Sequence, residues 1–478
     1  MNDKTSRDSL SNIVVVGSGA EAAAVSVALG VSLKGSGIRT TLVSPSHGQS
    51  STGVARVRGG DSAFHGRLGI DENELMKSTA AVYSLGSRFN GFVTSNDSTF
   101  VPLGAHGMTM RLVPFHHHWI RSMAAGDTGQ YNDYSLTAAA AERGRFEPAK
   151  TGDNAVLATV AYDLLVDLDL YTHYCRRMAQ SLGVKVVNDD VSGVNIGADG
   201  CIEQVRLVDG TAIDGNFFID CSTERFLAGS LDPTAGFEDW SEWLHCDRFL
   251  SVLSRKQREP SLFTLLKAMD HGWLQCNTLQ NFTVYMLAFC SDYLDDTKAK
   301  RLLESNLVHS PVSSVELATY RPGRYSTPWV SNCVAIGPAA IAIEPLNVSS
   351  LQLAQNAALR LLGMLPAGRN DGMLAKEFNR MTANEHIGVR DLTILTYHLA
   401  GRHATPFWAG LRNSALPDSL QKRVELFRRV GRVNTNENEW LGADDWLSCM
   451  INFGLLPDKC SPLVDMADAG QVRASMLA

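Results

Sequence analysis

Apolar and β-branched residues open the chain in a pattern that predicts a strand, a tight turn and a helix. Ile13–Val16 is a short β-branched run, the hexapeptide GSGAEA follows at residues 17–22, and an alanine-rich stretch continues to Leu33. A second apolar run at Thr40–Val43 stands at the distance expected for the next parallel strand of a βαβ unit. The opening of the chain therefore predicts an α/β fold with a doubly wound, Rossmann-type sheet.

Later apolar runs extend this sheet from distant parts of the chain. They predict further strands at Val184–Val187, Cys201–Val208, Phe217–Ile219 and Cys333–Ile336. Beyond Leu346 the apolar residues take helical spacing, in segments 351–365, 387–399, 420–430 and 445–451. We therefore expect a discontinuous, sheet-containing part over residues 1–350 and a mainly helical part over residues 351–478 packed on it.

Two segments between these elements predict irregular structure. Residues 46–60 are rich in glycine, serine and glutamine and are typical of a loop over a site, and residues 127–146 predict an excursion with a short alanine-rich helix. The chain shows neither an internal repeat nor a low-complexity segment.

Composition narrows the class of protein. The 478 residues are 45% hydrophobic, enough for one large or two fused domains. The net charge of −7 comes without a basic block, so nucleic acid is not an expected partner. No apolar run reaches the ~18 residues of a membrane span, and the polar start predicts neither a secretory nor a lipidation signal. The nine cysteines are scattered without a CxxC pair, which indicates reduced thiols in a cytoplasmic protein and no zinc site.

The turn after the first strand carries a dinucleotide signature. Gly17 and Gly19 allow close approach of a pyrophosphate to a helix N-terminus, and Ala22 takes the place of the third glycine. The alternative is an ordinary tight turn between strand and helix. An acidic residue normally follows the second strand and binds the adenosine ribose, but here that place falls on Ser44, and residues 22–60 contain no Asp or Glu. A serine hydroxyl forms only a neutral hydrogen bond, which predicts a weakened nucleotide site.

A set of ordered motifs over nearly the whole chain resembles the flavin-dependent halogenases, the tryptophan-halogenase branch of the flavoprotein monooxygenase fold. The motifs lie at residues 68–72, 114–117, 218–222, 239–248, 332–337, 344–346, 390–391, 397–399, 406–408, 416–420, 446–447 and 454–457. The resemblance implies FAD-binding-like and substrate modules within residues 1–350. It also implies FAD as the cofactor and an indole- or phenol-like substrate from secondary metabolism.

The residues that halogenate in this family are replaced. Family members use a peroxyflavin to oxidise halide, a lysine to activate the halogen and a glutamate to assist aromatic substitution. The resemblance places the lysine position on Ser84 and the glutamate position on Asn347. A serine cannot form a haloamine, and an asparagine cannot act as a base near neutral pH. We therefore expect an oxidoreductase of this family that does not halogenate.

Further positions that the resemblance assigns to the site have also changed. The tryptophan signature falls on residues 273–278, where only Trp273 is kept, and residues 338–343 replace a glycine- and serine-bearing stretch near the flavin. Ser349 and Ser350 replace the residues whose backbone helps to hold halide. The candidate catalytic positions are Ser84, His106, Glu344 and Asn347. The candidate cofactor positions are Gly17, Gly19, Ala22, Ser44, Arg56, Gly337, Pro338, Ser349 and Ser350. FAD binding is expected to be weak or absent.

Other polar and aromatic groups allow two interpretations each. His106 lies at the mouth of an aromatic site or is a loop histidine, and Arg56 and Arg58 grip an anionic ligand or lie in a solvated loop. The adjacent residues His116, His117 and His118 invite a metal site, but neighbouring side chains point different ways and cannot all bind one ion. Several aromatic residues line a pocket or fill the core: Trp240, Trp243, Trp273, Phe407 and Trp408.

Three classes of function stay open at this point. The chain is a flavin oxidoreductase, a flavin-free enzyme that uses the same pocket for non-redox chemistry, or a catalytically silent partner of an active flavoprotein. The expected partners are an aromatic small molecule and a flavin reductase or homologous flavoprotein, and a homodimer is also open.

Overall fold

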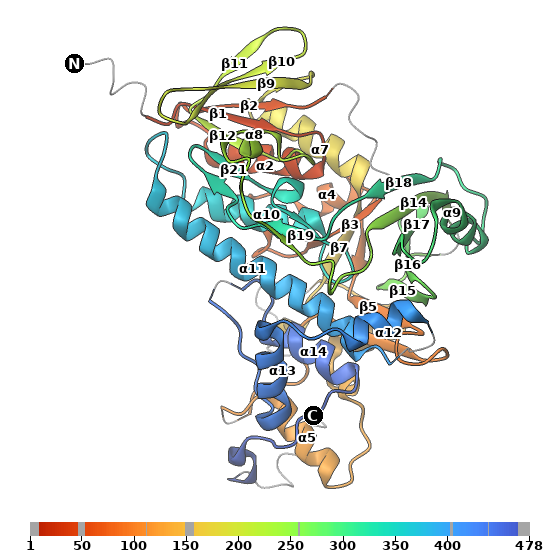
Figure 1. Cartoon of the computed structure of the whole chain (residues 1–478). Helices are drawn as coiled ribbons and strands as arrows, with labels where there is room; N and C mark the ends of the chain where they lie inside the picture. The colour runs from red at the N-terminus through yellow and green to blue at the C-terminus, as the bar shows by residue number, and fades with distance from the viewer. Residues whose placement is uncertain are drawn as a thin grey trace. The chain divides into compact units, whose positions relative to one another are not determined.

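The computed structural model of the chain describes residues 9–45, 53–110, 112–148, 157–256, 259–401, 405–437 and 439–466. The helices and strands gather into two units, each assembled from three segments of the chain (Figure 1). The first unit takes residues 1–81, 165–241 and 319–386, and the second takes residues 82–164, 242–318 and 387–478. The boundary at residue 350 that we expected from the sequence stays a prediction, and it differs from the boundaries of these two units.

A six-stranded sheet in strand order β20-β21-β12-β1-β2-β8 forms the centre of the first unit. Its strands are β1 (Asn12–Val16), β2 (Arg39–Val43), β8 (Lys185–Val187), β12 (Phe217–Asp220), β20 (Trp329–Val330) and β21 (Cys333–Ala335). All neighbours pair in parallel except β20 with β21. The strand order reverses at β1, which confirms the predicted doubly wound α/β fold and places its ligand crevice at the carboxyl ends of β1 and its neighbours.

Helices and a second sheet lie along the central sheet. The helices α2 (Ala20–Ser32), α7 (Leu168–Ser181) and α10 (Ser350–Leu362) pack on one another. A three-stranded antiparallel sheet of β9 (Val191–Ile196), β10 (Ile202–Leu207) and β11 (Ala212–Asp214) shares a core cluster with the central sheet and α8 (Phe226–Leu231). Figure 1 shows this small sheet and the helices on opposite faces of the central sheet.

The prediction that residues 201–208 extend the parallel sheet was wrong about their partners. β10 pairs antiparallel with β9 and β11. Its buried and exposed residues alternate, so it buries Val205 and Leu207 and turns Glu203 and Arg206 outward. That alternation is typical of an antiparallel sheet with one face in solvent.

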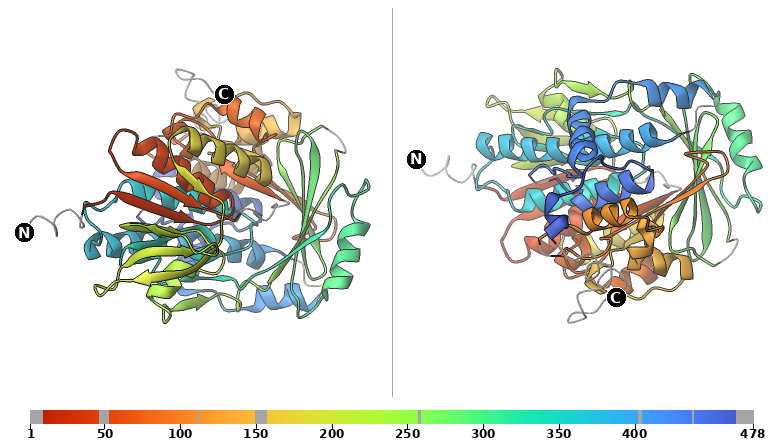
Figure 2. Two further views of the ribbon diagram at one scale, coloured as in Figure 1. Left: turned by 90° about the horizontal axis from the view of Figure 1, so that it is seen from above. Right: turned by 90° about the horizontal axis from the view of Figure 1, so that it is seen from below.

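The second unit is built on a seven-stranded sheet in strand order β18-β14-β17-β16-β15-β5-β6, which the sequence patterns did not predict. Its strands are β5 (Gly86–Asn90), β6 (Ser98–Pro102), β14 (Arg248–Arg255), β15 (Thr264–Met269), β16 (Gly272–Thr278), β17 (Phe282–Phe289) and β18 (Glu316–Thr319). The pairs β14–β17, β17–β16, β16–β15 and β5–β6 are antiparallel, and β15 pairs with β5 in parallel. Helix α9 (Asp296–Ser305) lies along one face, where Ala299 and Leu303 enter the core (Figure 2).

The helical C-terminal part is confirmed. It contains α11 (Gly372–Leu399), α12 (Pro406–Asn413), α13 (Asp418–Val430) and α14 (Ala443–Asn452), of which α11 begins earlier than expected and α12 was not predicted. The excursion at residues 127–146 carries the expected helix, α6 (Leu136–Arg143). The remaining elements of the described chain include α3 (Phe64–Arg67), α4 (Glu72–Ser78), α5 (Phe115–Ala124), β3 (Val54–Arg58), β4 (Val82–Ser84) and β7 (Asp163–Asp167).

The prediction that residues 46–60 form a loop was wrong in part. Residues 54–58 form strand β3, in which Ala55 and Val57 are buried and Arg56 alternates with them. Residues 46–52 lie outside the described part of the chain.

All nine cysteines are free thiols. Within the described ranges, no helix combines the length and the apolar character needed to cross a lipid bilayer.

Candidate functional site

The glycine turn between β1 and α2 forms as predicted, and close packing explains its first glycine. A Cβ built on Gly17 would stand 2.9 Å from the Cβ atom and the carbonyl oxygen of Cys221, which follows β12. Gly17 also has a φ of +154°, which L side chains rarely adopt. Gly19 is the N-cap of α2, and no side-chain hydrogen bond caps this end of the helix. The first backbone N–H groups of α2 therefore point into the crevice at the ends of β1 and β12.

The carboxyl group of Glu21 faces this turn. Its Oε2 atom is 2.9 Å from the place that a Cβ on Gly19 would take, and its Cγ is 3.0 Å from the corresponding place on Gly337. The residue keeps some solvent contact, but protein atoms enclose its carboxyl group, and this burial raises its pKa. Hydrogen bonds from the Ser350 hydroxyl and from the backbone at Glu21 lower the pKa in part.

The sequence patterns did not single out Glu21. The available signal was its position, because it stands between the second glycine and Ala22, directly before the acid-free residues 22–60. Its contacts with Gly337 and Ser350 come from segments more than 300 residues away, so their significance needed the fold.

Ser44 lies at the end of β2, at the place predicted for the ribose-binding acid. Its side chain is buried, and its hydroxyl accepts a hydrogen bond of 2.7 Å from Nη1 of Arg176 on α7. Nη2 of Arg176 donates to Oδ1 of Asn188 at 2.6 Å. The hydroxyl that would receive a ribose therefore already binds a guanidinium group of the chain, and the sequence did not predict this arginine.

Arg56 lies beside the segment that opens α10. Its Nη1 donates to the backbone oxygen of Asn347 at 3.2 Å, and its own backbone oxygen accepts from the Ser349 hydroxyl. Ser349 is also the N-cap of α10, where its hydroxyl accepts from the backbone N–H of Gln352 at 3.2 Å. Arg56 and Ser349 therefore have structural contacts that tie β3 to α10.

The segment before α10 contains three more of the predicted positions, and Ala22 in α2 is the fourth. Gly337 has a φ of +64° and opens a short 3₁₀ helix with Pro338. Glu344, which follows in the same segment, and Ala22 are buried. Thus Gly19, Gly337 and Ser350 meet around Glu21, and Gly17 packs on Cys221. Ser44 lies with Arg176, and Arg56 lies with Asn347 and Ser349.

Ser84 and His106 belong to the second unit. Ser84 is buried at the end of β4, and its hydroxyl donates to the backbone oxygen of Gly86 at 3.2 Å. His106 stacks on Tyr131 with ring centroids 4.0 Å apart, and its Nε2 pairs with Oδ1 of Asn132 at 2.9 Å. Burial lowers the pKa of His106 to about 4, so the ring is neutral at neutral pH.

The three adjacent histidines contact the C-terminal part of the second unit. Nε2 of His116 pairs with the backbone oxygen of Gly431 at 2.7 Å, and Nδ1 of His117 accepts from the backbone N–H of Ser461 at 3.2 Å. His118 is buried beside them. In the ranges that the structure describes, no three His, Cys, Asp or Glu side chains gather closely enough to hold a metal ion.

The aromatic residues proposed for a pocket are mostly enclosed. Trp240, Trp273, Phe407 and Trp408 are each at most 1% exposed. Trp273 donates from Nε1 to the Tyr397 hydroxyl at 2.7 Å, and Trp408 donates to a backbone oxygen. These contacts favour the interpretation as core over that as a pocket lining.

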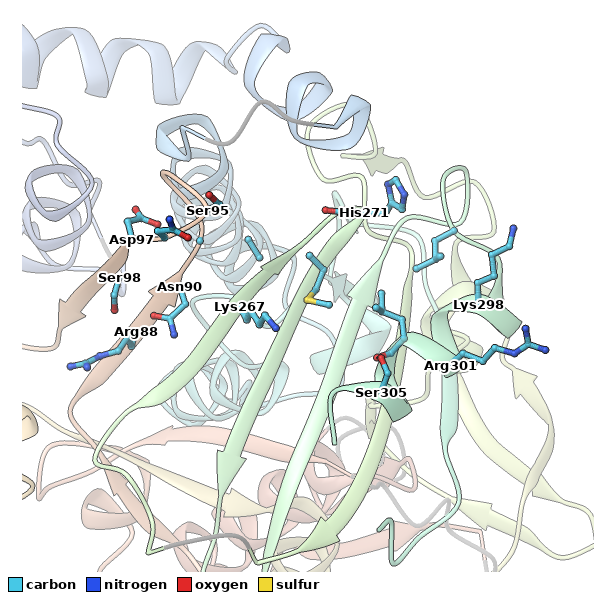
Figure 3. Close-up of a pocket in the computed structure, with 17 residues that line it drawn as sticks. Arg88, Asn90, Ser95, Asp97, Ser98, Lys267, His271, Lys298, Arg301 and Ser305 are labelled. Carbon is cyan, nitrogen blue, oxygen red and sulfur yellow. The ribbon is translucent and has the colours of Figure 1, made fainter. Parts of the chain in front are cut away.

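A hollow of about 1030 Å³ lies in the second unit beside β5, β15 and α9. Its lining includes Arg88, Lys267, His271 and Arg301, and none of the residues predicted for the site. Figure 3 shows the ends of Arg88 and Arg301 extending in opposite directions, so the charged groups do not converge on one point.

A sequence model of the tryptophan halogenase family matches residues 12–469. The chain belongs to this family. It is 24% identical to tryptophan 7-halogenase RebH of Lentzea aerocolonigenes, over 95% of this chain and 91% of RebH. Two solved flavin-dependent halogenases are also similar: BrvH from Brevundimonas sp. BAL3, with a TM-score of 0.91, and Xcc4156 from Xanthomonas campestris, with a TM-score of 0.92. Each is 29% identical and covers 98% of this chain and 94% of its own.

Membership in this family of flavin-dependent enzymes confirms the resemblance and implies a place for FAD in the first unit. The glycine turn and the N-terminus of α2 are the parts that could hold the pyrophosphate. The ionised carboxyl of Glu21 would compete with a phosphate for the same N–H groups and the same positive end of the helix dipole. The residues around this turn therefore do not fit a dinucleotide while Glu21 is ionised.

Proposed function

We propose that this chain is a diverged member of the flavin-dependent halogenase family that does not halogenate its aromatic ligand. The observation that carries the proposal is the state of Ser84, which the family resemblance places at the lysine position. Its hydroxyl is buried and donates to Gly86 within the same turn. A hydroxyl in that state offers neither the amine that forms a haloamine nor a cationic N–H for hypohalous acid.

Asn347 supports the same conclusion. It stands at the position of the family's glutamate, and its backbone is bound by Arg56. An amide side chain has no basic form near neutral pH, so it cannot take the proton released in aromatic substitution. The proposed ligand is an indole- or phenol-like metabolite, because RebH is named for tryptophan and this chain matches it over 95% of its length.

A flavin-free role is the second candidate function. Glu21 at the glycine turn and Arg176 on Ser44 both weaken the place for FAD. Under this proposal the chain is either an enzyme of non-redox chemistry or a silent partner of an active flavoprotein, instead of a flavin oxidoreductase.

One pair of measurements tests both candidates. The purified protein is incubated with tryptophan, indole or phenol, chloride or bromide, FAD and a flavin reductase, with RebH as the positive control, and the products are analysed by mass spectrometry. We expect no halogenated product, and halide incorporation above a reaction without enzyme contradicts the proposal. Flavin absorbance that stays with the protein through gel filtration selects the oxidoreductase, and its loss selects the flavin-free role.

A further inference from the structure

The acid at the β1–α2 turn lies where doubly wound folds bind phosphate. The strand order reverses at β1, with β12 on one side and β2 on the other, and ligands of such sheets bind at the carboxyl ends of these strands. Three separate segments meet at the Glu21 side chain: the turn at Gly19, the 3₁₀ helix at Gly337 and the start of α10 at Ser350. Glu21 therefore points into the crevice and not along the outer surface of α2.

We propose that Glu21 determines the ligand specificity of this crevice: its ionised carboxyl takes the position of a dinucleotide phosphate at the N-terminus of α2, so that FAD binds only when Glu21 is protonated. This inference rests on the proposed weak binding of FAD and gives it a cause. It also predicts that binding of FAD is accompanied by uptake of one proton.

The surroundings of Glu21 supply no compensating positive charge among the described residues. The groups that act on its carboxyl are the enclosing protein atoms, its own backbone and the Ser350 hydroxyl. From the end of β12, Cys221 faces it as a neutral thiol, because burial, Asp220 and Glu21 all raise the thiol pKa. Asp220 accepts hydrogen bonds from three backbone N–H groups and the Ser222 hydroxyl. A phosphate brought to this turn would meet a carboxylate instead of a cation.

The raised pKa of Glu21 fits this role. Enclosure already disfavours the ionised form, and an approaching phosphate would disfavour it further, so protonation is the way in which the crevice can accept the anion. Above the pKa of Glu21, the affinity for FAD should fall by about tenfold for each unit of pH, because each molecule bound must first protonate the carboxyl.

The test compares FAD binding by four proteins: wild type, Glu21→Gln, Glu21→Ala and Asp418→Asn. Asp418 is an exposed acid in the first turn of α13, so its variant removes one negative charge from the first turn of a different helix. Oxidised FAD is titrated at pH ~6 and pH ~8, with quenching of flavin fluorescence as the readout and circular dichroism as the check on folding.

We expect both Glu21 variants to bind FAD at least about tenfold more tightly than wild type at pH ~8, with little dependence on pH. Wild type and Asp418→Asn should bind more tightly at pH ~6 than at pH ~8. If folded Glu21→Gln and Glu21→Ala bind no better than wild type, Glu21 is not the determinant and the inference is overturned. A pH dependence that persists in Glu21→Gln also overturns it, because another group then carries the proton.

The proposed function fails by a different result. Glu21→Gln is also assayed for halogenation with a flavin reductase and halide. Halogenated product from this variant would contradict the non-halogenating assignment while leaving the tighter FAD binding intact. Tighter FAD binding without halogenated product supports both.

Discussion

A buried ion pair in the second unit allows a quantitative test of how this part of the protein is held together. Glu439 and Arg423 are 1% and 4% exposed at their side chains, and Nη2 of Arg423 lies 2.8 Å from Oε2 of Glu439. Oε1 of Glu439 accepts from Nε1 of Trp446 at 3.1 Å, and Oε2 also accepts from the backbone N–H of Asn436 at 2.8 Å. The Arg423 guanidinium stacks on the Trp446 ring at 3.8 Å.

Replacement of Glu439 by alanine leaves three donors without their acceptor and one buried cation without its partner. Breaking a buried pair in this way costs about 3–5 kcal/mol. Glu439→Gln keeps an acceptor but loses the charge, and we expect it to lower the free energy of unfolding by roughly 1.5–3 kcal/mol, as for a hydrogen bond to a charged group. The exposed pair of Glu425 and Arg429, four residues apart on α13, is the control, and Glu425→Ala should cost less than about 0.5 kcal/mol.

The assay is urea unfolding, followed by both circular dichroism and tryptophan fluorescence so that separate transitions of the two units are recognised. The expected order of destabilisation is Glu439→Ala, then Glu439→Gln, then Glu425→Ala. A free energy of unfolding for Glu439→Ala within 1 kcal/mol of the Glu425→Ala value, about the contribution of one ordinary hydrogen bond, would refute the reasoning.

Three further changes test other parts of the structure. Gly17→Ala should lower the free energy of unfolding by roughly 1–3 kcal/mol, because the new Cβ would stand 2.9 Å from the Cβ and the carbonyl oxygen of Cys221. The control Gly372→Ala meets nothing within 4 Å, and equal thermal midpoints of the two variants would contradict this reasoning. Burial lowers the pKa of His65 to about 4, below its ordinary value of ~6.5. As the pH falls from ~6.5 towards ~4, the unfolded chain therefore takes up this proton before the folded protein does. The free energy of unfolding should then fall by up to roughly 3 kcal/mol. His65→Gln should flatten the profile of stability against pH, and an unchanged slope would show that other groups cause it. Ser84→Lys with Asn347→Glu should not restore halide incorporation measured by mass spectrometry. The family resemblance implies that residues 273–278 and 338–343 have changed as well, and a misplacement of ~1 Å can lower the rate about a hundredfold. Robust halogenation by this double variant would show that those other changes matter little.

Local patterns predicted the elements whose contacts are close in sequence. β1, the glycine turn, α2 and β2 follow one another within residues 12–43, and each was predicted from its own residues. The helices α10, α13 and α14 and the second half of α11 were found for the same reason, since helical spacing is a property of one segment.

Contacts between distant segments set the limit of these predictions. The strand at residues 201–208 is a different case, because its partners β9 and β11 are its neighbours in sequence; these two strands were not predicted, so the antiparallel pairing was missed. The assignment of Ser44 to the ribose position stays a prediction. Its partner Arg176 lies 132 residues further on, and nothing near Ser44 in the sequence indicates this contact. Strand β3 was not predicted, because it lies in a segment rich in turn-forming residues.

The division of each unit into three segments has a consequence for synthesis of the chain. The chain passes from one unit to the other after residues 81, 164, 241, 318 and 386. Gly337 and Ser350, which meet Glu21, belong to the third segment of the first unit. Domains that occupy one stretch of chain can fold on the ribosome as soon as that stretch emerges. Here the crevice is incomplete until α10 has been made, which ends at Leu362 of the 478 residues. Truncation after residue 318 would leave a first unit without β21 and α10, and neither unit can be cut out as a continuous fragment.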